Sequence, residues 1–140
     1  FGDPETQPVL LRLKSDLVSH CMAALNNSLN REKVEWETRK SLGVVMASGG
    51  YPGSYSNNHP ILGLEDISSN YGHKIFHGGT KFADNRLVTN GGRVLCVTAL
   101  GDSLEDAKTS AYELVSKISW ENVQYRTDIG WRAIEKNKKN

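Results

Sequence analysis

Two short turns combine glycine with a cation, and this combination favours an anionic ligand. Gly79-Thr80-Lys81 and Gly91-Gly92-Arg93 each place a positive side chain next to residues whose backbone can approach another group closely. Backbone amides beside an ammonium or guanidinium group suit a phosphate. Each turn alone is more typical of an antiparallel sheet with many reversals, since an isolated glycine-rich loop is a weak signal. Together they predict a phosphate-facing edge, although the sequence has no GxxxxGK[ST] loop.

A second candidate site lies at the beginning of the sequence. Gly2-Asp3-Pro4-Glu5 is a turn whose two carboxylates could act on an amine or a metal ion. The alternative is that both acids cap the positive end of the following helix, and spacing alone favours this alternative somewhat. The turn leads straight into an amphipathic segment, without an initiator Met, a signal peptide or a polar tail. We therefore expect the chain to be a C-terminal piece of a larger enzyme.

The remaining reactive side chains form no recognisable catalytic or metal-binding pattern. The four histidines share no ligand spacing, and no Ser or Cys has an evident His partner, which disfavours a triad or a zinc site. Cys21 and Cys96 lie among apolar residues. Two buried thiols in a reducing cytoplasm are therefore favoured over a disulfide.

The composition restricts the class of protein. The 140 residues fit one folded domain, and 38% hydrophobic with 24% charged residues is typical of a globular chain. A net charge of +1 gives no field that would attract nucleic acid or a membrane surface. No apolar run approaches the ~20 residues that span a bilayer. We expect a cytoplasmic protein without nucleic-acid or membrane partners.

The spacing of apolar residues predicts one long helix from Thr6 to Asn30. Its stripe recurs at steps of three and four residues, through Leu10, Leu13, Leu17, Cys21 and Leu25. The rest of the chain does not supply a complete partner surface, so we expect this stripe to be partly exposed. The predicted boundaries are residues 1–31 for this helical part, 32–40 for a charged connector and 41–140 for a β-rich domain.

From residue 41 the pattern changes from helix to sheet. Strands are predicted at 42–47, 74–77 and 93–100, and Asp84-Asn85 is the signal for a two-residue hairpin. Ser103 and Asp106 have the spacing of a capping box for a helix that runs to about Ile118. Residues 65–67 are a candidate short helix, and the tail frays from residue 136. The predicted fold class is α+β, a leading helix followed by antiparallel strands with one helix packed across them.

Five motifs occur in a fixed order along the chain. They are Gly2-Asp3-Pro4-Glu5-Thr6-Gln7-Pro8, the stretch from Val44 to Tyr55, Phe76-His77-Gly78-Gly79-Thr80, the stretch from Val88 to Leu95, and Tyr125-Arg126-Thr127-Asp128-Ile129-Gly130. Over essentially its whole length the chain resembles the C-terminal third of the phosphoribosylamine–glycine ligase (glycinamide ribonucleotide synthetase) family. The resemblance implies the end of an ATP-grasp fold, residues 1–31, followed by a small antiparallel β-rich C-terminal domain with one packed helix.

The resemblance also implies a reaction. The family joins glycine to 5-phosphoribosylamine in purine biosynthesis through glycyl phosphate, with ATP cleaved to ADP and phosphate and with Mg or Mn as the metal. A Glu and an Asn that hold the metal, and most of the ATP site, are expected upstream of Phe1, in an ATP-grasp domain against which this chain would pack. No catalytic residue is assigned within the chain.

The matching positions at the active-site edge are Gly2, Asp3, Pro4 and Glu5. Gly91-Gly92-Arg93 is similar to a basic motif that related ATP-grasp enzymes place against the ribose phosphate. One departure is Gly78-Gly79-Thr80, where the family pattern is closer to His-Ala-Gly-Thr. An alternative function is a non-catalytic β-rich binding or interaction module derived from an ATP-grasp enzyme. A carrier domain is disfavoured, because no Lys lies in a Met-Lys-Met or Asp-Lys-Ala type of tip.

Overall fold

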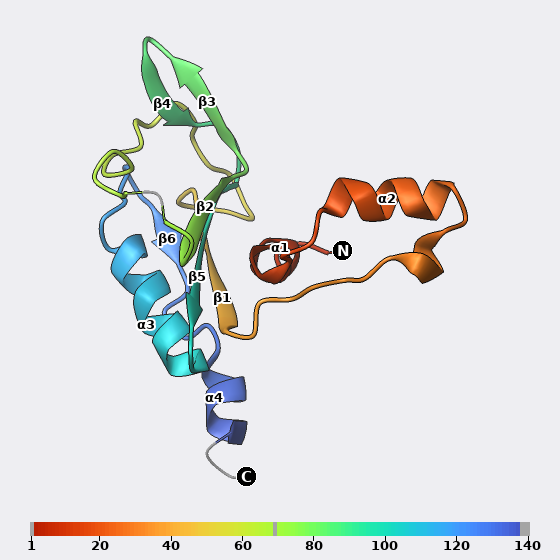
Figure 1. The fold of residues 1–140 in the computed structure, drawn as a ribbon. Helices are drawn as coiled ribbons and strands as arrows, with labels where there is room; N and C mark the ends of the chain where they lie inside the picture. Colours follow the sequence, from red (N-terminus) through yellow and green to blue (C-terminus); the bar gives the residue numbers. More distant parts are fainter. Residues whose placement is uncertain (1, 69, 138–140) are drawn as a thin grey trace.

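The structure is a computed structural model that describes residues 2–68 and 70–137. Its centre is a four-stranded antiparallel sheet with the strand order β2-β5-β1-β6 (Figure 1). These strands are β1 (Lys40–Ala47), β2 (His73–His77), β5 (Arg93–Gly101) and β6 (Gln124–Tyr125). Beyond it, β3 (Thr80–Ala83) and β4 (Arg86–Thr89) form a separate two-stranded antiparallel sheet. The predicted α+β class is confirmed.

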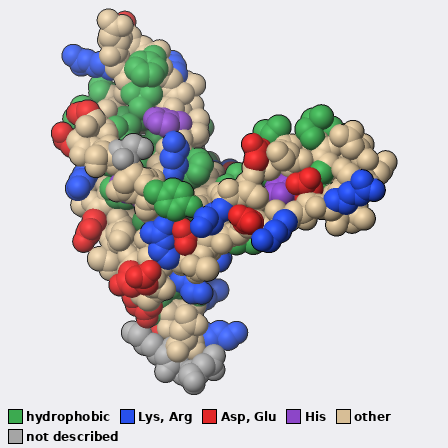
Figure 2. Space-filling view, viewed as in Figure 1, with side chains coloured by type: hydrophobic (Ala, Val, Ile, Leu, Met, Phe, Trp, Pro, Cys, Tyr) green, Lys and Arg blue, Asp and Glu red, His purple; other side chains and the backbone are tan. Residues whose placement is uncertain are grey.

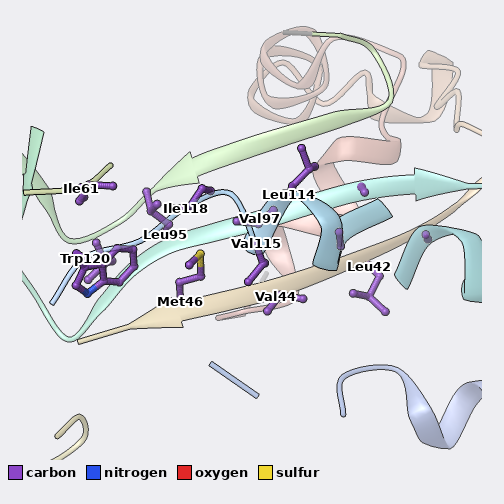
Figure 3. Close-up of a cluster of buried hydrophobic side chains, with 14 residues drawn as sticks. Leu42, Val44, Met46, Ile61, Leu95, Val97, Leu114, Val115, Ile118 and Trp120 are labelled. Carbon is purple, nitrogen blue, oxygen red and sulfur yellow. The ribbon is translucent and has the colours of Figure 1, made fainter. Parts of the chain in front are cut away.

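One face of the larger sheet is covered by α3 (Leu104–Val115), and the core lies between them (Figure 1, Figure 3). Strand alternation directs every second residue of β1 and β5 into this layer. The labelled core side chains in Figure 3 are Leu42, Val44, Met46, Ile61, Leu95, Val97, Leu114, Val115, Ile118 and Trp120. The capping box is confirmed, since Ser103 Oγ accepts from Asp106 N and Ser103 N donates to the Asp106 carboxylate, both at 3.0 Å. The helix ends at Val115 rather than near Ile118.

The predicted hairpin is also confirmed. Asp84 and Asn85 join β3 to β4 with φ values of 49° and 58°. Two consecutive residues with positive φ are what a type I′ turn needs, and Asp and Asn tolerate this conformation better than most residues. The two residues Asp84 and Asn85 were therefore enough to predict this hairpin from the sequence.

The single helix predicted from Thr6 to Asn30 is wrong. The chain forms α1 (Thr6–Arg12), α2 (Leu17–Leu25) and a 3₁₀ turn, η1 (Leu29–Arg31). Leu13 leaves the helix with extended backbone and bridges to Trp36, and Lys14 N donates to Glu35 O at 2.9 Å. Asp16 then caps α2 by accepting from Val18 N and Ser19 N at 2.6 and 3.1 Å. This Asp cap begins a new helix within an apolar stripe that suggested one continuous helix.

The first of these helices lies on the sheet face opposite α3 (Figure 1). Gly43 of β1 makes this approach possible, because a Cβ there would stand 3.3 Å from Pro8 Cδ, Cys96 Sγ and Thr98 Cγ2. Ser41 Oγ donates to Pro8 O at 2.7 Å and fastens the same turn of α1. The turn before α1 is thereby held beside the sheet.

The arm formed by α2 and η1 projects away from the sheet (Figure 1). Ala23 is buried in α2, whereas Val18, Met22 and Leu25 are exposed, and Figure 2 shows hydrophobic side chains along the outer side of this arm. Leu17, Cys21 and Leu25 of the predicted stripe are exposed as well, so the expectation of a partly exposed apolar stripe is met within this chain.

Two C-terminal elements were not predicted. β6 pairs with the end of β1, with Met46 opposite Tyr125 and Ala47 opposite Gln124. α4 (Trp131–Asn137) begins in a segment for which no element was predicted and extends to residue 137, past the position where fraying was expected to begin. The candidate short helix at residues 65–67 is a turn. Within the described ranges, no helix has the length and apolar character that a membrane span requires.

Candidate functional site

The two candidate sites from the sequence meet at Asp3 and Arg93. Arg93 Nη2 lies 2.6 Å from Asp3 Oδ2, and the two side chains are 47% and 54% exposed. Arg93 is the first residue of β5, while Asp3 stands in the turn that α1 holds beside the sheet. A pair this exposed contributes about 0–1 kcal/mol, because water screens it. An incoming anion can therefore replace Asp3 on the guanidinium at little cost.

Tyr51 supports the arginine from another side. The Arg93 guanidinium carbon lies 5.7 Å from the centre of the Tyr51 ring, within the range of a cation–π contact. A Cβ at Gly92 would overlap this ring, so the ring packs directly on the backbone that precedes Arg93. Gln124 Nε2 donates to Tyr51 O at 2.8 Å and ties this loop to β6.

Two hollows adjoin the Asp3–Arg93 pair. The first, of about 340 Å³, is lined by Asp3, Gln7, Val45, Tyr51, Phe76, His77, Gly78, Gly92, Arg93, Leu95 and Cys96. The second, of about 530 Å³, is more apolar and is lined by Pro4, Gly43, Val45, Ala47, Tyr51, Arg93, Gln124, Tyr125, Arg126 and Ile129. Arg93 and Tyr51 belong to both, so a ligand in either hollow would contact the same cation.

The loop after β6 forms the far side of the second hollow, and α3 fixes it. Tyr112 OH donates to Arg126 O at 2.6 Å and accepts from Ile129 N at 3.2 Å. Arg126 donates from Nε and Nη2 to the two oxygens of Asp128 at 2.8 and 2.6 Å. These hydrogen bonds lower the pKa of Asp128 and raise the pKa of Arg126, whereas burial raises the pKa of the Tyr112 hydroxyl. The loop therefore has a defined shape.

The two glycine turns pack against each other. Gly79 N donates to Arg93 O at 2.9 Å, and Asn90 N donates to Gly79 O at 2.7 Å. A Cβ at Gly79 would stand 2.8 Å from Gly91 Cα, so close backbone approach explains the absence of side chains there. Thr80 N donates to Gly78 O, and Gly92 is buried. The sequence predicted that the backbone amides of Gly79 and Thr80 could bind a phosphate. In the structure both amides instead donate hydrogen bonds to carbonyl oxygens of the turns and of Arg93.

The other residues predicted for the site do not all lie at the two hollows around Arg93. Pro4 lines the second hollow, whereas Thr80 and Lys81 line neither; Thr80 Oγ1 contacts His77 Nδ1 at 3.2 Å. The carboxylate of Glu5 lies over Gly2. Glu5 is the N-cap residue of α1 but makes no side-chain cap, and Asp3 pairs with Arg93 instead. Neither Asp3 nor Glu5 therefore caps α1 through its side chain.

Two expectations about reactive groups are corrected. Cys96 is buried beside the first hollow, and this burial raises the pKa of its thiol to about 11, but Cys21 is exposed on the projecting arm. A Ser and a His do meet, since Ser56 Oγ lies 2.6 Å from His59 Nε2, whose ring partner Nδ1 lies 3.1 Å from Glu121. These three residues lie outside both hollows around Arg93.

Several residues of the site were not singled out from the sequence. Tyr51, Gln124, Tyr125 and Arg126 surround Arg93 or the second hollow. Tyr51 and the Tyr125-Arg126 pair lie inside motifs that carried the family resemblance. These residues could have been identified only by knowing that their motifs lie side by side in the fold, and the spacing of the motifs along the sequence does not show this. In the described ranges, no group of three or more His, Cys, Asp or Glu side chains could hold a metal ion.

Comparison with known proteins identifies the family of the chain. Residues 41–132 match the family model described as "Phosphoribosylglycinamide synthetase, C domain". The chain is 55% identical over 141 aligned residues to the phosphoribosylamine--glycine ligase of Escherichia coli, and 53% identical over 138 to that of Pseudomonas syringae pv. tomato. In both cases the match covers 99% of this chain and 32% of the relative, so the chain spans about a third of their length.

A solved structure gives the same result. The crystal structure of phosphoribosylamine--glycine ligase from Thermotoga maritima resembles this chain with a TM-score of 0.67 and 32% identity. The similarity covers 91% of this chain and 31% of that chain. The family model spans most of the chain, and these relatives match it nearly from end to end. The chain therefore belongs to the phosphoribosylglycinamide synthetase C-domain family.

Proposed function

We propose that this chain is the C-terminal part of a phosphoribosylamine–glycine ligase and that its Asp3–Arg93 edge binds the ribose phosphate of 5-phosphoribosylamine. The relatives that bear this name support the activity, and they are about three times as long as the chain. The observation that carries the proposal is Arg93 itself, an exposed guanidinium shared by two hollows and paired with a single exposed carboxylate.

The chemistry of that pair suits a phosphate better than a carboxylate. A guanidinium can bind two phosphate oxygens in a bidentate manner, and a phosphate carries more negative charge than Asp3. When the phosphate takes Arg93, the Asp3 carboxylate is left beside the bound sugar. It can then accept a hydrogen bond from a ribose hydroxyl or from the amine of the substrate.

ATP and Mg or Mn would act elsewhere in the complete ligase. When bound, they supply phosphoryl transfer to glycine. The described part of this chain does not fit the metal, because it has no cluster of three or more ligating side chains. We therefore assign ATP, the metal and glycine mainly to the part of the relatives that this chain does not match, and assign no reaction step to its residues.

The projecting arm has a role in the same proposal. Val18, Met22 and Leu25 expose an apolar face on α2, and burying such a face is favourable by about 25 cal/mol per Å². We assign this face to contact with the ATP-grasp part of the ligase. The turn from Gly2 to Glu5 would then stand where the two parts meet.

A chimera tests the proposal. This chain replaces the matching third of the E. coli relative, and the chimeric ligase is expressed in a strain that lacks its own ligase. Growth without added purine is the expected result. The matched control is the E. coli relative truncated before that third, which should not restore growth. A chimera that is expressed and folded but restores no growth would contradict the proposed function.

A further inference from the structure

Tyr51 is held more firmly than a residue in an exposed loop needs to be. Its backbone N donates to Ser48 O at 3.1 Å, and its carbonyl accepts from Gln124 Nε2 at 2.8 Å. Its ring packs on Gly92 and lies 6.2 Å from the ring of Tyr55 at an interplanar angle of 59°. The position of the ring is thus fixed by β6, by the second glycine turn and by its own loop.

The fixed ring of Tyr51 lies next to the Arg93 side chain, the proposed phosphate-binding group. Arg93 follows Gly92 directly, so the ring covers the backbone from which the guanidinium extends. The guanidinium carbon lies 5.7 Å from the ring centre on one side and the Asp3 carboxylate binds it on another. A free arginine side chain has many rotamers, and ordering it on binding weakens affinity. An aromatic surface reduces that loss before the ligand arrives.

Gly92 belongs to the same arrangement. A side chain at this position would occupy the space of the Tyr51 ring, whatever its chemistry. The φ of Gly92 lies outside the region that favours glycine, since positive φ values occur at Gly50, Gly63 and Gly130 among the described glycines. The lack of a Cβ at Gly92 therefore serves the packing of the ring rather than the conformation of the turn.

We infer that Tyr51 is a positioning residue for Arg93: its ring, seated on Gly92 and anchored through Gln124, holds the guanidinium at the edge shared by the two hollows, ready for a phosphate. This inference rests on the proposed function. Tyr51 acts through Arg93 and not on the reacting atoms.

Steady-state kinetics of the chimeric ligase test it, with each substrate varied in turn and a melting curve for every variant. Tyr51→Leu removes the aromatic surface and should raise KM for 5-phosphoribosylamine about three- to tenfold, with kcat and the KM values of ATP and glycine nearly unchanged. Gly92→Ala displaces the Tyr51 ring and should also raise KM for 5-phosphoribosylamine. Tyr51→Phe keeps the ring and should stay within about twofold of the parent.

Tyr71→Leu is the matched control, because the Tyr71 ring centre also lies 5.7 Å from a guanidinium carbon, that of Arg39, but Tyr71 lines neither hollow. It should leave KM for 5-phosphoribosylamine unchanged. If Tyr51→Leu does not fold, Gln124→Ala loosens the anchor with the ring intact and should raise the same KM by a smaller factor.

Three results would overturn the inference. One is an unchanged KM in Tyr51→Leu, or in Gln124→Ala where the first variant does not fold. Another is an equal rise in Tyr71→Leu, and the third is a rise in all three KM values together. Arg93→Ala distinguishes a failure of the positioning role of Tyr51 from a failure of the proposed phosphate contact of Arg93. If it raises KM for 5-phosphoribosylamine while Tyr51→Leu does not, this inference fails alone; if Arg93→Ala also leaves that KM unchanged, the phosphate contact fails with it.

Discussion

Arg93 and Asp3, which are far apart in the sequence, form an ion pair of 2.6 Å at the edge of the larger sheet. The pair exists because α1 docks on Gly43 and is fastened by the hydrogen bond from Ser41 to Pro8 O. The N-terminal turn and the glycine turn before β5 are thereby joined into one candidate site. This relationship makes Asp3 a competitor for any anion that binds Arg93.

Asp3→Asn is expected to strengthen phosphate binding. The amide can still accept a hydrogen bond from Arg93 but no longer neutralises it, so an exposed pair worth up to about 1 kcal/mol is weakened. The inhibition constant of ribose 5-phosphate against 5-phosphoribosylamine in the chimeric ligase should fall about two- to fivefold. Asp66→Asn, another exposed acid outside both hollows, is the control. Weaker inhibition in Asp3→Asn would mean that Asp3 assists the phosphate rather than competing with it.

Glu37 should make stability depend on pH in the acid range. Its carboxylate accepts from Arg39 Nη2 at 2.9 Å and from Arg39 N at 3.2 Å, and the side-chain hydrogen bond is the main reason that its pKa falls from 4.5 to about 2. A lowered pKa in the folded state stabilises the protein above the unfolded-state value and loses this effect as pH falls toward the folded-state value. The difference in unfolding free energy between the parent and Glu37→Gln should therefore be largest above about pH 4.5 and shrink toward pH 2. Urea unfolding at several pH values measures it, and a constant difference would refute the assignment.

The two thiols should differ sharply in reactivity. Cys21 is exposed, whereas Cys96 is buried and its pKa is raised to about 11, so Cys96 forms little thiolate near neutral pH. In native protein a chromogenic disulfide reagent should titrate one thiol quickly, and the second only after unfolding. Cys21→Ser should abolish the fast reaction. A fast phase that survives in this variant would show that Cys96 is accessible.

Much of the sheet could be predicted because its signals are local. Asp84 and Asn85 specify their own turn, Ser103 and Asp106 cap their own helix, and the glycine-rich reversals separate the predicted strands. The helix break at residues 13–16 was concealed because an apolar stripe continues through it. The cap at Asp16 and the pairing of Lys14 with Glu35 decide the outcome, and only the first of these is visible nearby in the sequence.

The candidate site could be predicted only in part. Arg93 and Asp3 were each singled out from their own turns, but their pairing depends on how α1 docks, which no spacing records. Thr80 and Lys81 were singled out on the same argument as Arg93, yet they line neither hollow, because their turn uses its amides to hold the turn before β5. Tyr51 and Gln124 gain their roles only from contacts between distant segments.

The exposed face of α2 should make the isolated chain bind an apolar dye. Val18 and Met22 are 69% and 52% exposed on the arm, and a contiguous apolar surface of this kind marks an interface. Replacing both with Ser should reduce the fluorescence of a bound naphthalene sulfonate dye. Phe82→Ser is the control, because Phe82 is 80% exposed but lies on the distant hairpin. Dye binding that follows Phe82 instead would place the apolar interface elsewhere.

Arg93 is proposed to bind the phosphate of 5-phosphoribosylamine, and the KM of Arg93→Ala for this substrate measures that contact. Losing a charge-assisted contact costs about 1.5–3 kcal/mol, so kcat/KM for this substrate in the chimeric ligase should fall about tenfold to a hundredfold, mainly through KM. The KM values of ATP and glycine should hardly change, and Arg86→Ala, on β4 and outside both hollows, should behave as the parent. An unchanged KM for 5-phosphoribosylamine, with only a lower melting temperature, would mean that Arg93 merely pairs with Asp3 and would contradict the account.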